Sequence, residues 1–129
     1  MLPGVTCTRL GADRCPGLLK PFVAQDGAII RLRVPGGRVR VSTLADLLAI
    51  GADHGAPLLS VTSRTNLQVR GLPDPLPEDV MVRAEATGLL PSPSHERARN
   101  ILAAPLAPDL QPLVAELDAA LCADPFLAD

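Results

Sequence analysis

The sequence predicts an α+β domain in which helices pack on one face of a mixed or antiparallel sheet. Residues 28–34 and 66–70 alternate apolar and polar side chains with the period of a strand, and residues 43–55 and 109–121 carry leucines at helical spacing. Fourteen prolines and ten glycines among 129 residues indicate many chain reversals, which is unlike a helical bundle. The length suits one domain with a core of its own and is too short for two full catalytic domains.

Turn residues and the alternation of apolar and polar side chains predict the first two strands. Residues 18–23 can be extended, although Pro21 keeps them at the edge of a sheet. Asp26 and Gly27 then form a turn that leads into a strand at residues 28–34. One face of this strand is apolar and the other carries cations, so that Ile30, Leu32 and Val34 lie opposite Ile29, Arg31 and Arg33.

A helix, a short apolar segment and a further strand come next. Thr43 followed by Asp46 resembles a capping box, so we expect a helix to begin there and to end near Gly55. Residues 58–62 form a short apolar segment. Residues 66–70 then alternate again, which predicts a second strand with one apolar and one polar face.

Two more helices and a short strand complete the predicted order. Glu78 lies in the first turn of a helix that Gly88 ends, and residues 101–104 form a possible short strand. Asp109 is the expected N-cap of the last helix. This order of elements fits a ferredoxin-like split βαβ topology best.

Composition excludes several classes of function. Two Phe residues and no Tyr or Trp provide few rings on which single-stranded bases could stack, so an RNA-binding protein of that kind is not expected. A formal net charge of −2 favours neither DNA nor a membrane surface. The sequence contains no signal peptide and no apolar run long enough for a membrane span, so we expect a cytoplasmic protein.

The candidate metal ligands and nucleophiles are poorly placed for chemistry. Cys7, Cys15 and Cys122 are an odd set without paired spacing, and they cannot complete an iron–sulfur cluster or a structural zinc site. His54 and His95 have no second ligand at a useful spacing, so we expect structural roles for both. We therefore expect no metal in this chain.

Charge is distributed unevenly along the chain. Residues 1–100 carry all twelve basic side chains, of which only Lys20 is not Arg, against nine acidic ones. Residues 101–129 carry five acidic side chains and no basic one. The excess of Arg over Lys has two equally good explanations, a high-GC coding bias and a need for forked anion donors. The positions of the arginines must decide between these two explanations.

The polar faces of the two alternating strands form a candidate binding surface, which carries Arg31, Arg33, Gln68 and Arg70. Alternate residues of a strand lie about 6.6 Å apart on one face, so each arginine pair can hold two separate anionic groups. Guanidinium forks match carboxylates, which favours a polycarboxylate ligand. The alternative is a solvated outer face on which arginines pair with Asp and Glu, and the pattern alone slightly favours it.

Three motifs resemble those of one superfamily. Residues 31–37 read RLRVPGG, residues 62–71 read TSRTNLQVRG, and residues 99–101 read RNI ahead of Pro105 and Leu106. In this order and spacing they resemble the N-terminal part of the nitrite and sulfite reductase superfamily, over roughly residues 15–107. The CPG at 15–17, the form of the central motif and the LCADP at 121–125 make the chain most similar to the precorrin-3B synthase family of aerobic cobalamin synthesis.

The resemblance implies a ferredoxin-like half-domain at residues 15–107, between an irregular arm at 1–14 and a C-terminal helix and tail at 108–129. It implies a site that binds the carboxylates of a sirohaem-type tetrapyrrole or a substrate anion. Motif positions supply Arg33, Arg64 and Arg99 to this site, with Thr62 and Gln68 as further polar contacts. Arg31 joins them by alternation alone, and Arg70 stands where some relatives have His.

The chain departs from the superfamily in what it lacks. The resemblance implies a 4Fe–4S cluster held by two cysteine pairs and a Lys-x-Lys motif, both further along the chain, and neither occurs here. We expect a truncated or separately encoded part of a tetrapyrrole-acting oxidoreductase, inactive alone and with no cofactor of its own. The alternative parent is a sirohaem-dependent nitrite or sulfite reductase.

A different class of function is a non-catalytic module that self-associates. The resemblance implies that such a half-domain pairs with a second copy, so an isolated one should expose apolar surface and form a homodimer. The expected partners are a tetrapyrrole polycarboxylate and either the second half-domain of the parent or another copy of this chain, with no nucleic acid and no membrane.

Overall fold

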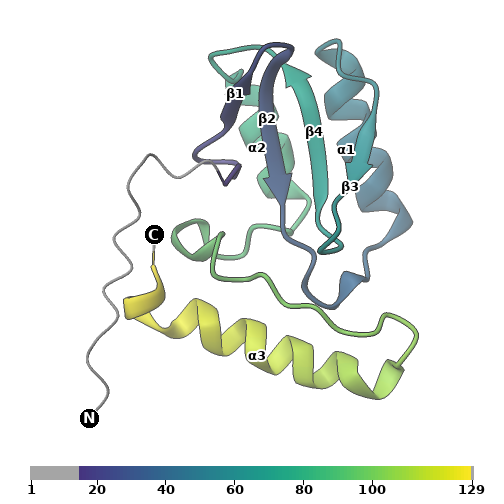
Figure 1. Ribbon diagram of the computed structural model, residues 1–129, viewed down its shortest axis with the longest axis vertical. Coiled ribbons are helices and arrows are strands. Elements are labelled where there is room, and N and C mark those ends of the chain that lie inside the picture. Colours follow the sequence, from purple (N-terminus) through teal and green to yellow (C-terminus); the bar gives the residue numbers. More distant parts are fainter. Residues whose placement is uncertain (1–14, 129) are drawn as a thin grey trace.

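The computed structural model describes residues 15–128, so the arm predicted at residues 1–14 lies outside the described residues. A four-stranded sheet has the strand order β1-β2-β4-β3 (Figure 1). Its strands are β1 (Phe22–Ala24), β2 (Gly27–Leu32), β3 (Leu59–Val61) and β4 (Leu67–Leu72). Every neighbouring pair of strands is antiparallel, so the sheet is antiparallel and not mixed.

The connections between strands give the split topology that the sequence predicts. β2 and β3 are both antiparallel to β4, so they run in the same direction with β4 between them. Helix α1 (Val41–Asp53) connects β2 to β3, and helix α2 (Glu78–Ala86) follows β4. This arrangement is a split βαβ unit, extended at its other edge by β1. The α+β fold of a ferredoxin-like half-domain is thereby confirmed.

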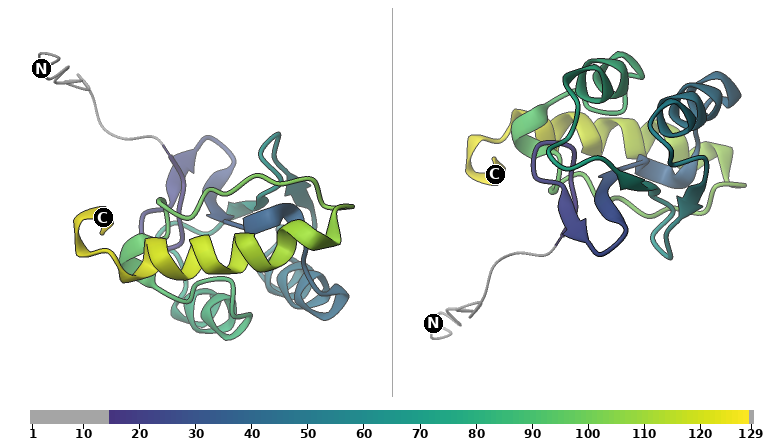
Figure 2. Two further views of the ribbon diagram at one scale, coloured as in Figure 1. Left: turned by 90° about the horizontal axis from the view of Figure 1, so that it is seen from below. Right: turned by 90° about the horizontal axis from the view of Figure 1, so that it is seen from above.

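The core lies between the sheet and the two helices that cover one of its faces. Figure 2 shows α1 and α2 side by side on this face, while the described residues place no helix on the other. The alternation along β2 and β4 agrees with this layering. The fully buried side chains at its centre come from both layers: Ile30, Leu32 and Val69 from the sheet, and Leu47, Ile50 and Val80 from the helices. Burial of each such side chain stabilises the fold by about 1.5–3 kcal/mol.

Helix α3 (Gln111–Ala123) lies across the end of the sheet at which β2 ends (Figure 1). It contacts the short 3-10 turn at Pro35–Gly37. Gly36 has a φ of 73°, and a Cβ at this position would lie 2.9 Å from Oε1 of Gln111 and 3.1 Å from a methyl group of Val114. Glycine is therefore required for the turn to approach the helix so closely. Val114 is the single buried residue of α3.

Two predicted helix caps are wrong. Helix α1 begins at Val41, with Arg40 as an N-cap that makes no side-chain hydrogen bond, and Thr43 is buried inside the first turn. Thr43 is therefore inside α1 and forms no capping box with Asp46. Asp109 lies in a 3-10 turn at Pro108–Leu110 that precedes α3, so it does not cap that helix.

Two predicted strands also differ from the structure. Residues 101–104 pair with no described strand, and the only ladder-like bond there joins the N–H of Gly36 to the carbonyl of Ile101. Of residues 18–23, only the last two belong to β1, because Leu18 turns inward and is fully buried. None of the helices in the described part of the chain is long and apolar enough to cross a membrane.

Candidate functional site

The polar face of the sheet centres on a pair of side chains from neighbouring strands. Arg31 of β2 lies directly opposite Gln68 of β4, as their antiparallel register requires. Nε and Nη2 of Arg31 both donate to Oε1 of Gln68, at 3.3 Å and 3.1 Å. Ser60 of β3 is paired with Gln68 on the other side. Arg31 and Gln68 are half-buried, so this row is a preformed polar surface on the face without helices.

Arg33 continues the same alternation but is buried, with 3 % of its surface exposed. Its guanidinium holds the loop that precedes β1, because Nη1 donates to the carbonyl of Pro16 at 2.8 Å and Nη2 contacts the sulfur of Cys15 at 2.9 Å. The carboxylate of Glu96 lies 3.9 Å from Nη1. Nε of Arg33 is buried and has no hydrogen-bond partner among the described residues.

Arg64 lies at the tip of the turn between β3 and β4. The hydroxyl of Thr62 accepts hydrogen bonds from the backbone N–H groups of Arg64, at 3.3 Å, and of Asn66, at 3.2 Å. Thr65 adopts a φ of 58°, which few residues other than glycine do. This turn is thus held by its own hydrogen bonds, and it presents Arg64 to solvent with no side-chain partner among the described residues.

A second loop brings two further arginines to the same end of the sheet. A Cβ on Gly37 would lie 3.2 Å from Oγ1 of Thr65, so the loop after β2 packs against the turn that carries Arg64. Arg38 and Arg40 follow in this loop, and both are exposed. We call Arg38, Arg40 and Arg64 the basic rim. The sequence shows the first two as cations, but the packing of their loop against the turn that carries Arg64 is a tertiary contact.

Asn66 joins the three sequence motifs in space. Its Oδ1 accepts a hydrogen bond from the backbone N–H of Val34 at 3.0 Å, and its Nδ2 donates to Oδ1 of Asn100 at 2.7 Å. Asn66 is 4 % exposed. The roles of its amide atoms follow from its partners, because an N–H can only donate to the oxygen. Sequence reasoning quoted both asparagines within motifs without giving either a role.

Arg99 is hydrogen-bonded to a carboxylate of the C-terminal helix. Its Nε and Nη2 donate to the two carboxylate oxygens of Asp118 at 2.7 Å and 2.9 Å, and its Nη1 donates to the carbonyl of Leu89 at 2.8 Å. Arg99 is 3 % exposed. A bidentate pair in this setting anchors α3 to the rest of the domain. Its partner comes from the acidic C-terminal segment that the charge count singled out.

Arg70 forms a pair at the surface. Its Nε and Nη2 donate to the two carboxylate oxygens of Asp26 at 2.7 Å and 3.0 Å, and both side chains are about half exposed. The hydrogen bond from Arg70 lowers the pKa of Asp26, and the same bond raises the pKa of Arg70. For this arginine the structure shows the solvated ion pair that was the alternative interpretation of the polar face.

Both histidines have structural contacts. Nε2 of His95 lies 2.8 Å from the carbonyl of Asp124, just after α3, while its Nδ1 contacts the hydroxyl of Ser92 at 2.8 Å. His54 lies 2.8 Å from a carboxylate oxygen of Asp79, and this hydrogen bond lowers the pKa of Asp79. Within residues 15–128, no group of three or more His, Cys, Asp or Glu side chains could hold a metal. The described residues therefore do not fit a 4Fe–4S cluster.

The seven predicted site residues thus fall into three groups. Arg31 and Gln68 form a pair on the open face, and Arg64 is exposed on the turn that Thr62 holds. Arg33, Arg70 and Arg99 are paired with groups of this chain. The structure therefore places Arg31, Gln68, Arg64 and the ion-paired Arg70 at the accessible surface, and it does not gather all seven around one cavity.

Comparison with known proteins gives one match. Residues 23–86 match the family model of the nitrite/sulfite reductase ferredoxin-like half domain. The matched segment runs from within β1 to the last residue of α2, so it contains Arg31, Arg64 and Gln68, whereas Arg99 and α3 lie beyond it. No curated protein and no solved structure matches the chain significantly.

Replacing Asn66 by Leu should destabilise the protein, because the buried N–H of Val34 then loses its acceptor. We expect the free energy of unfolding to fall by about 1–3 kcal/mol, measured by urea denaturation. Asn100→Ala is the matched control, since it removes the bond between the two amides but leaves the bond to Val34, and its effect should be smaller. Equal stability of Asn66→Leu and the wild type would contradict the linking role of Asn66.

Replacing Arg70 by Ala should raise the pKa of Asp26 toward its ordinary value, because the hydrogen bond that lowers it is lost. A carboxyl whose pKa is lower in the folded state stabilises the fold above its unfolded pKa, and this contribution disappears as the pH falls through the folded pKa. The stability difference between the wild type and Arg70→Ala should therefore shrink on acidification. Carbon-13 NMR titration of the Asp26 carboxyl measures the pKa directly. Arg83→Ala, which breaks a pair with Asp53 elsewhere, should leave the Asp26 titration unchanged.

Proposed function

We propose that this chain, whose residues 23–86 carry the nitrite/sulfite reductase ferredoxin-like half domain, is the N-terminal portion of an oxidoreductase that acts on a tetrapyrrole. Its part in that enzyme is to bind the carboxylates on the periphery of the tetrapyrrole. The observation that carries the proposal is the exposed guanidinium of Arg64, which a rigid turn presents in the central motif of the family.

The accessible residues form two sets of hydrogen-bond donors. Arg64 and the rest of the basic rim offer donors at the end of the sheet, and Arg31 with Gln68 offers a second donor set on the open face. A large, flat ligand with several carboxylates suits donors spread over a sheet better than a single small anion does. When bound, the tetrapyrrole would supply the conjugated ring on which the chemistry occurs, and this chain would orient it.

The arginines that are paired within the chain act as positioning residues in this proposal. Arg33 holds the loop of residues 15–18 beside the open face, and Arg99 holds α3. Arg70 orders the turn at Asp26 on the same face of the sheet. Thr62 maintains the turn that carries Arg64. Each of the seven residues therefore keeps a role, although only three of them present polar groups to a ligand directly.

Within the superfamily we propose a precorrin-3B synthase as the parent enzyme. Its reaction is an oxygen-dependent hydroxylation of the ring with lactone formation, to which this chain contributes ligand binding. The Cys15-Pro16-Gly17 motif supports this assignment, since Cys15 lies against Arg33 and within 4.0 Å of Arg31. In a longer protein that contains this segment, turnover of precorrin-3A would favour the synthase. Sirohaem as the prosthetic group would favour the alternative, a nitrite or sulfite reductase.

Titration of the chain with uroporphyrin III, a porphyrin with eight carboxylates, tests the binding proposal. We expect quenching of porphyrin fluorescence that weakens as salt is added, because the contacts are between charges. The double variant Arg31→Ala with Arg64→Ala should bind roughly tenfold or more weakly, since it removes two charge-assisted contacts.

Two controls make this titration specific. Arg83→Ala removes an arginine on α2, on the face of the sheet that the helices cover, and should bind uroporphyrin as the wild type does. A porphyrin with four N-methylpyridinium groups has the same ring and the opposite charge, and it should not bind. Equal binding of both porphyrins, or an unchanged affinity of the double variant, would contradict the proposal.

A second candidate function, a self-associating module, is favoured by the free edge of the sheet. Among residues 15–128, β3 has a neighbouring strand on one side only, and Leu58 and Val61 at this edge are 78 % and 71 % exposed. An exposed apolar edge strand is a template for pairing with another strand. We propose that β3 pairs with β3 of a second copy, in place of the second half-domain of the parent.

Sedimentation equilibrium tests this pairing. We expect a dimer at micromolar concentration, and Val61→Lys should shift it toward the monomer because a charge at the edge opposes strand pairing. Val23→Lys places the same charge on β1, at the opposite edge, and should leave the dimer intact. A wild-type monomer at high micromolar concentration would rule this module out.

A further inference from the structure

The carboxylate of Asp118 occupies an edge of the Arg99 guanidinium that matches a carboxylate. Nε and Nη2 of Arg99 donate to its two oxygens at 2.7 Å and 2.9 Å, while Nη1 donates to the carbonyl of Leu89. A guanidinium fork binds any planar carboxylate in this way, whether the carboxylate belongs to a side chain or to a ligand. If Asp118 moved away, Arg99 would therefore present a complete edge for another carboxylate.

Arg99 lies next to the turn that carries Arg64. The side chain of Asn100, its neighbour in the chain, accepts a hydrogen bond from Nδ2 of Asn66 at 2.7 Å. The backbone N–H of Asn66 is bonded to the hydroxyl of Thr62, which also accepts from the N–H of Arg64. The fork of Arg99 is thus close to the end of the sheet at which the tetrapyrrole carboxylates are proposed to bind.

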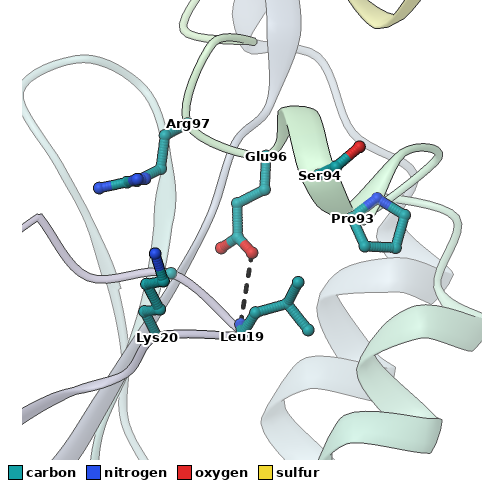
Figure 3. Close-up of a pocket in the computed structure, with 7 residues that line it drawn as sticks. Leu19, Lys20, Pro93, Ser94, Glu96 and Arg97 are labelled. Carbon is teal, nitrogen blue, oxygen red and sulfur yellow. Dashed lines mark hydrogen bonds between the residues drawn. The ribbon is translucent and has the colours of Figure 1, made fainter. Parts of the chain in front are cut away.

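Contacts that do not involve α3 hold the segment that leads to Arg99. The carboxylate of Glu96 accepts a hydrogen bond from the backbone N–H of Leu18 and another, at 3.3 Å, from the N–H of Leu19, and Figure 3 shows the second of these bonds. Gly17 permits this approach, because a Cβ there would overlap Oε1 of Glu96. This segment is therefore fixed to the loop before β1, so Arg99 keeps its place if α3 moves.

Helix α3 is the side of the contact that can move. Val114 is its single buried residue, and the carbonyl of Asp124, just after the helix, is bonded to His95 at 2.8 Å. Nε2 of Gln111, the first residue of the helix, is buried and has no hydrogen-bond partner among the described residues. A buried donor without a partner costs free energy, and the donor regains water when the helix moves away. A ligand that binds the displaced form can therefore shift the balance between the two positions of α3.

We propose that α3 is an autoinhibitory helix, in which Asp118 takes the place of a ligand carboxylate in the fork of Arg99. A carboxylate of the tetrapyrrole that enters this fork displaces the helix. This inference rests on the proposed function and adds the regulation of its site. Arg99 is structural while α3 is docked, and it joins Arg64 in binding the ligand once α3 is displaced. The apparent affinity for the ligand is lowered, because only the molecules with α3 displaced can use the fork.

The variant Asp118→Asn tests the competition between the two carboxylates. It keeps the size of the side chain and one acceptor oxygen but removes the charge. We expect it to bind uroporphyrin III roughly tenfold more tightly than the wild type in the fluorescence titration, because the competing carboxylate is lost. Glu116→Gln is the matched control, since it makes the same change of charge on the same helix. Glu116 is exposed and has no hydrogen-bond or ion-pair partner within residues 15–128, so its variant should bind as the wild type does.

Amide hydrogen exchange measures the displacement of α3 directly. Saturating uroporphyrin III should speed exchange at the amides of α3 in the wild type, while the amides of β2 and β4 stay protected. Asp118→Asn should show faster exchange in α3 without any ligand, and Glu116→Gln should not. Because the first of these measurements uses the wild type, it tests the proposal even if Asp118→Asn does not fold.

The outcomes separate this inference from the proposed function. Uroporphyrin binding with equal affinity to Asp118→Asn and the wild type, or α3 exchange that bound uroporphyrin does not speed, would overturn the autoinhibition and leave the proposed function standing. An equal gain in affinity for Glu116→Gln would also overturn it, because the gain would then be a general effect of charge. If neither the wild type nor Asp118→Asn bound uroporphyrin, the proposed function and this inference would both fall.

Discussion

The buried amide of Asn66 holds together three segments that lie far apart in the sequence. It accepts the N–H of Val34 just after β2, it donates to Asn100, and its own backbone N–H is bonded to Thr62 in the turn before β4. Each of these segments carries one of the motif arginines, at positions 33, 64 and 99. The geometry of all three guanidinium groups therefore depends on one side chain whose hydrogen-bonding groups are satisfied inside the protein.

The arginines of this chain fall into a buried, structural group and an exposed group that is available to a ligand. Arg33 and Arg99 are buried beside backbone carbonyls and a carboxylate, where an unpaired charge would be costly. Arg64 stays exposed on a turn that is held by its own hydrogen bonds, which leaves its guanidinium available to an outside anion. Neither a coding bias nor a single binding site accounts for both groups. Their burial and their partners separate the arginines that build the domain from those that can serve a ligand.

Much of the fold could be predicted because the relevant signals are local. Alternation along residues 28–34 and 66–70 placed Arg31 and Gln68 on the polar face, and the structure pairs them across two strands. The two cap predictions failed because Thr43 lies buried inside the first turn of α1 and Asp109 lies in a 3-10 turn ahead of α3, and no local pattern reveals either placement. The pairing of Arg99 with Asp118 was equally inaccessible, since it requires α3 to dock first.

The shallow attachment of α3 has a consequence for how the protein opens. This helix buries one residue, Val114, and is anchored by the ion pair between Arg99 and Asp118 and by the contact of His95 with the carbonyl of Asp124, whereas α1 buries four residues and α2 buries two. Elements with few buried contacts open locally at a lower free energy than the core. We therefore expect α3 to detach as a unit while the sheet stays folded, which would expose the guanidinium of Arg99 to water. We thus expect the sheet with α1 and α2 to unfold at a higher free energy than α3 requires to detach.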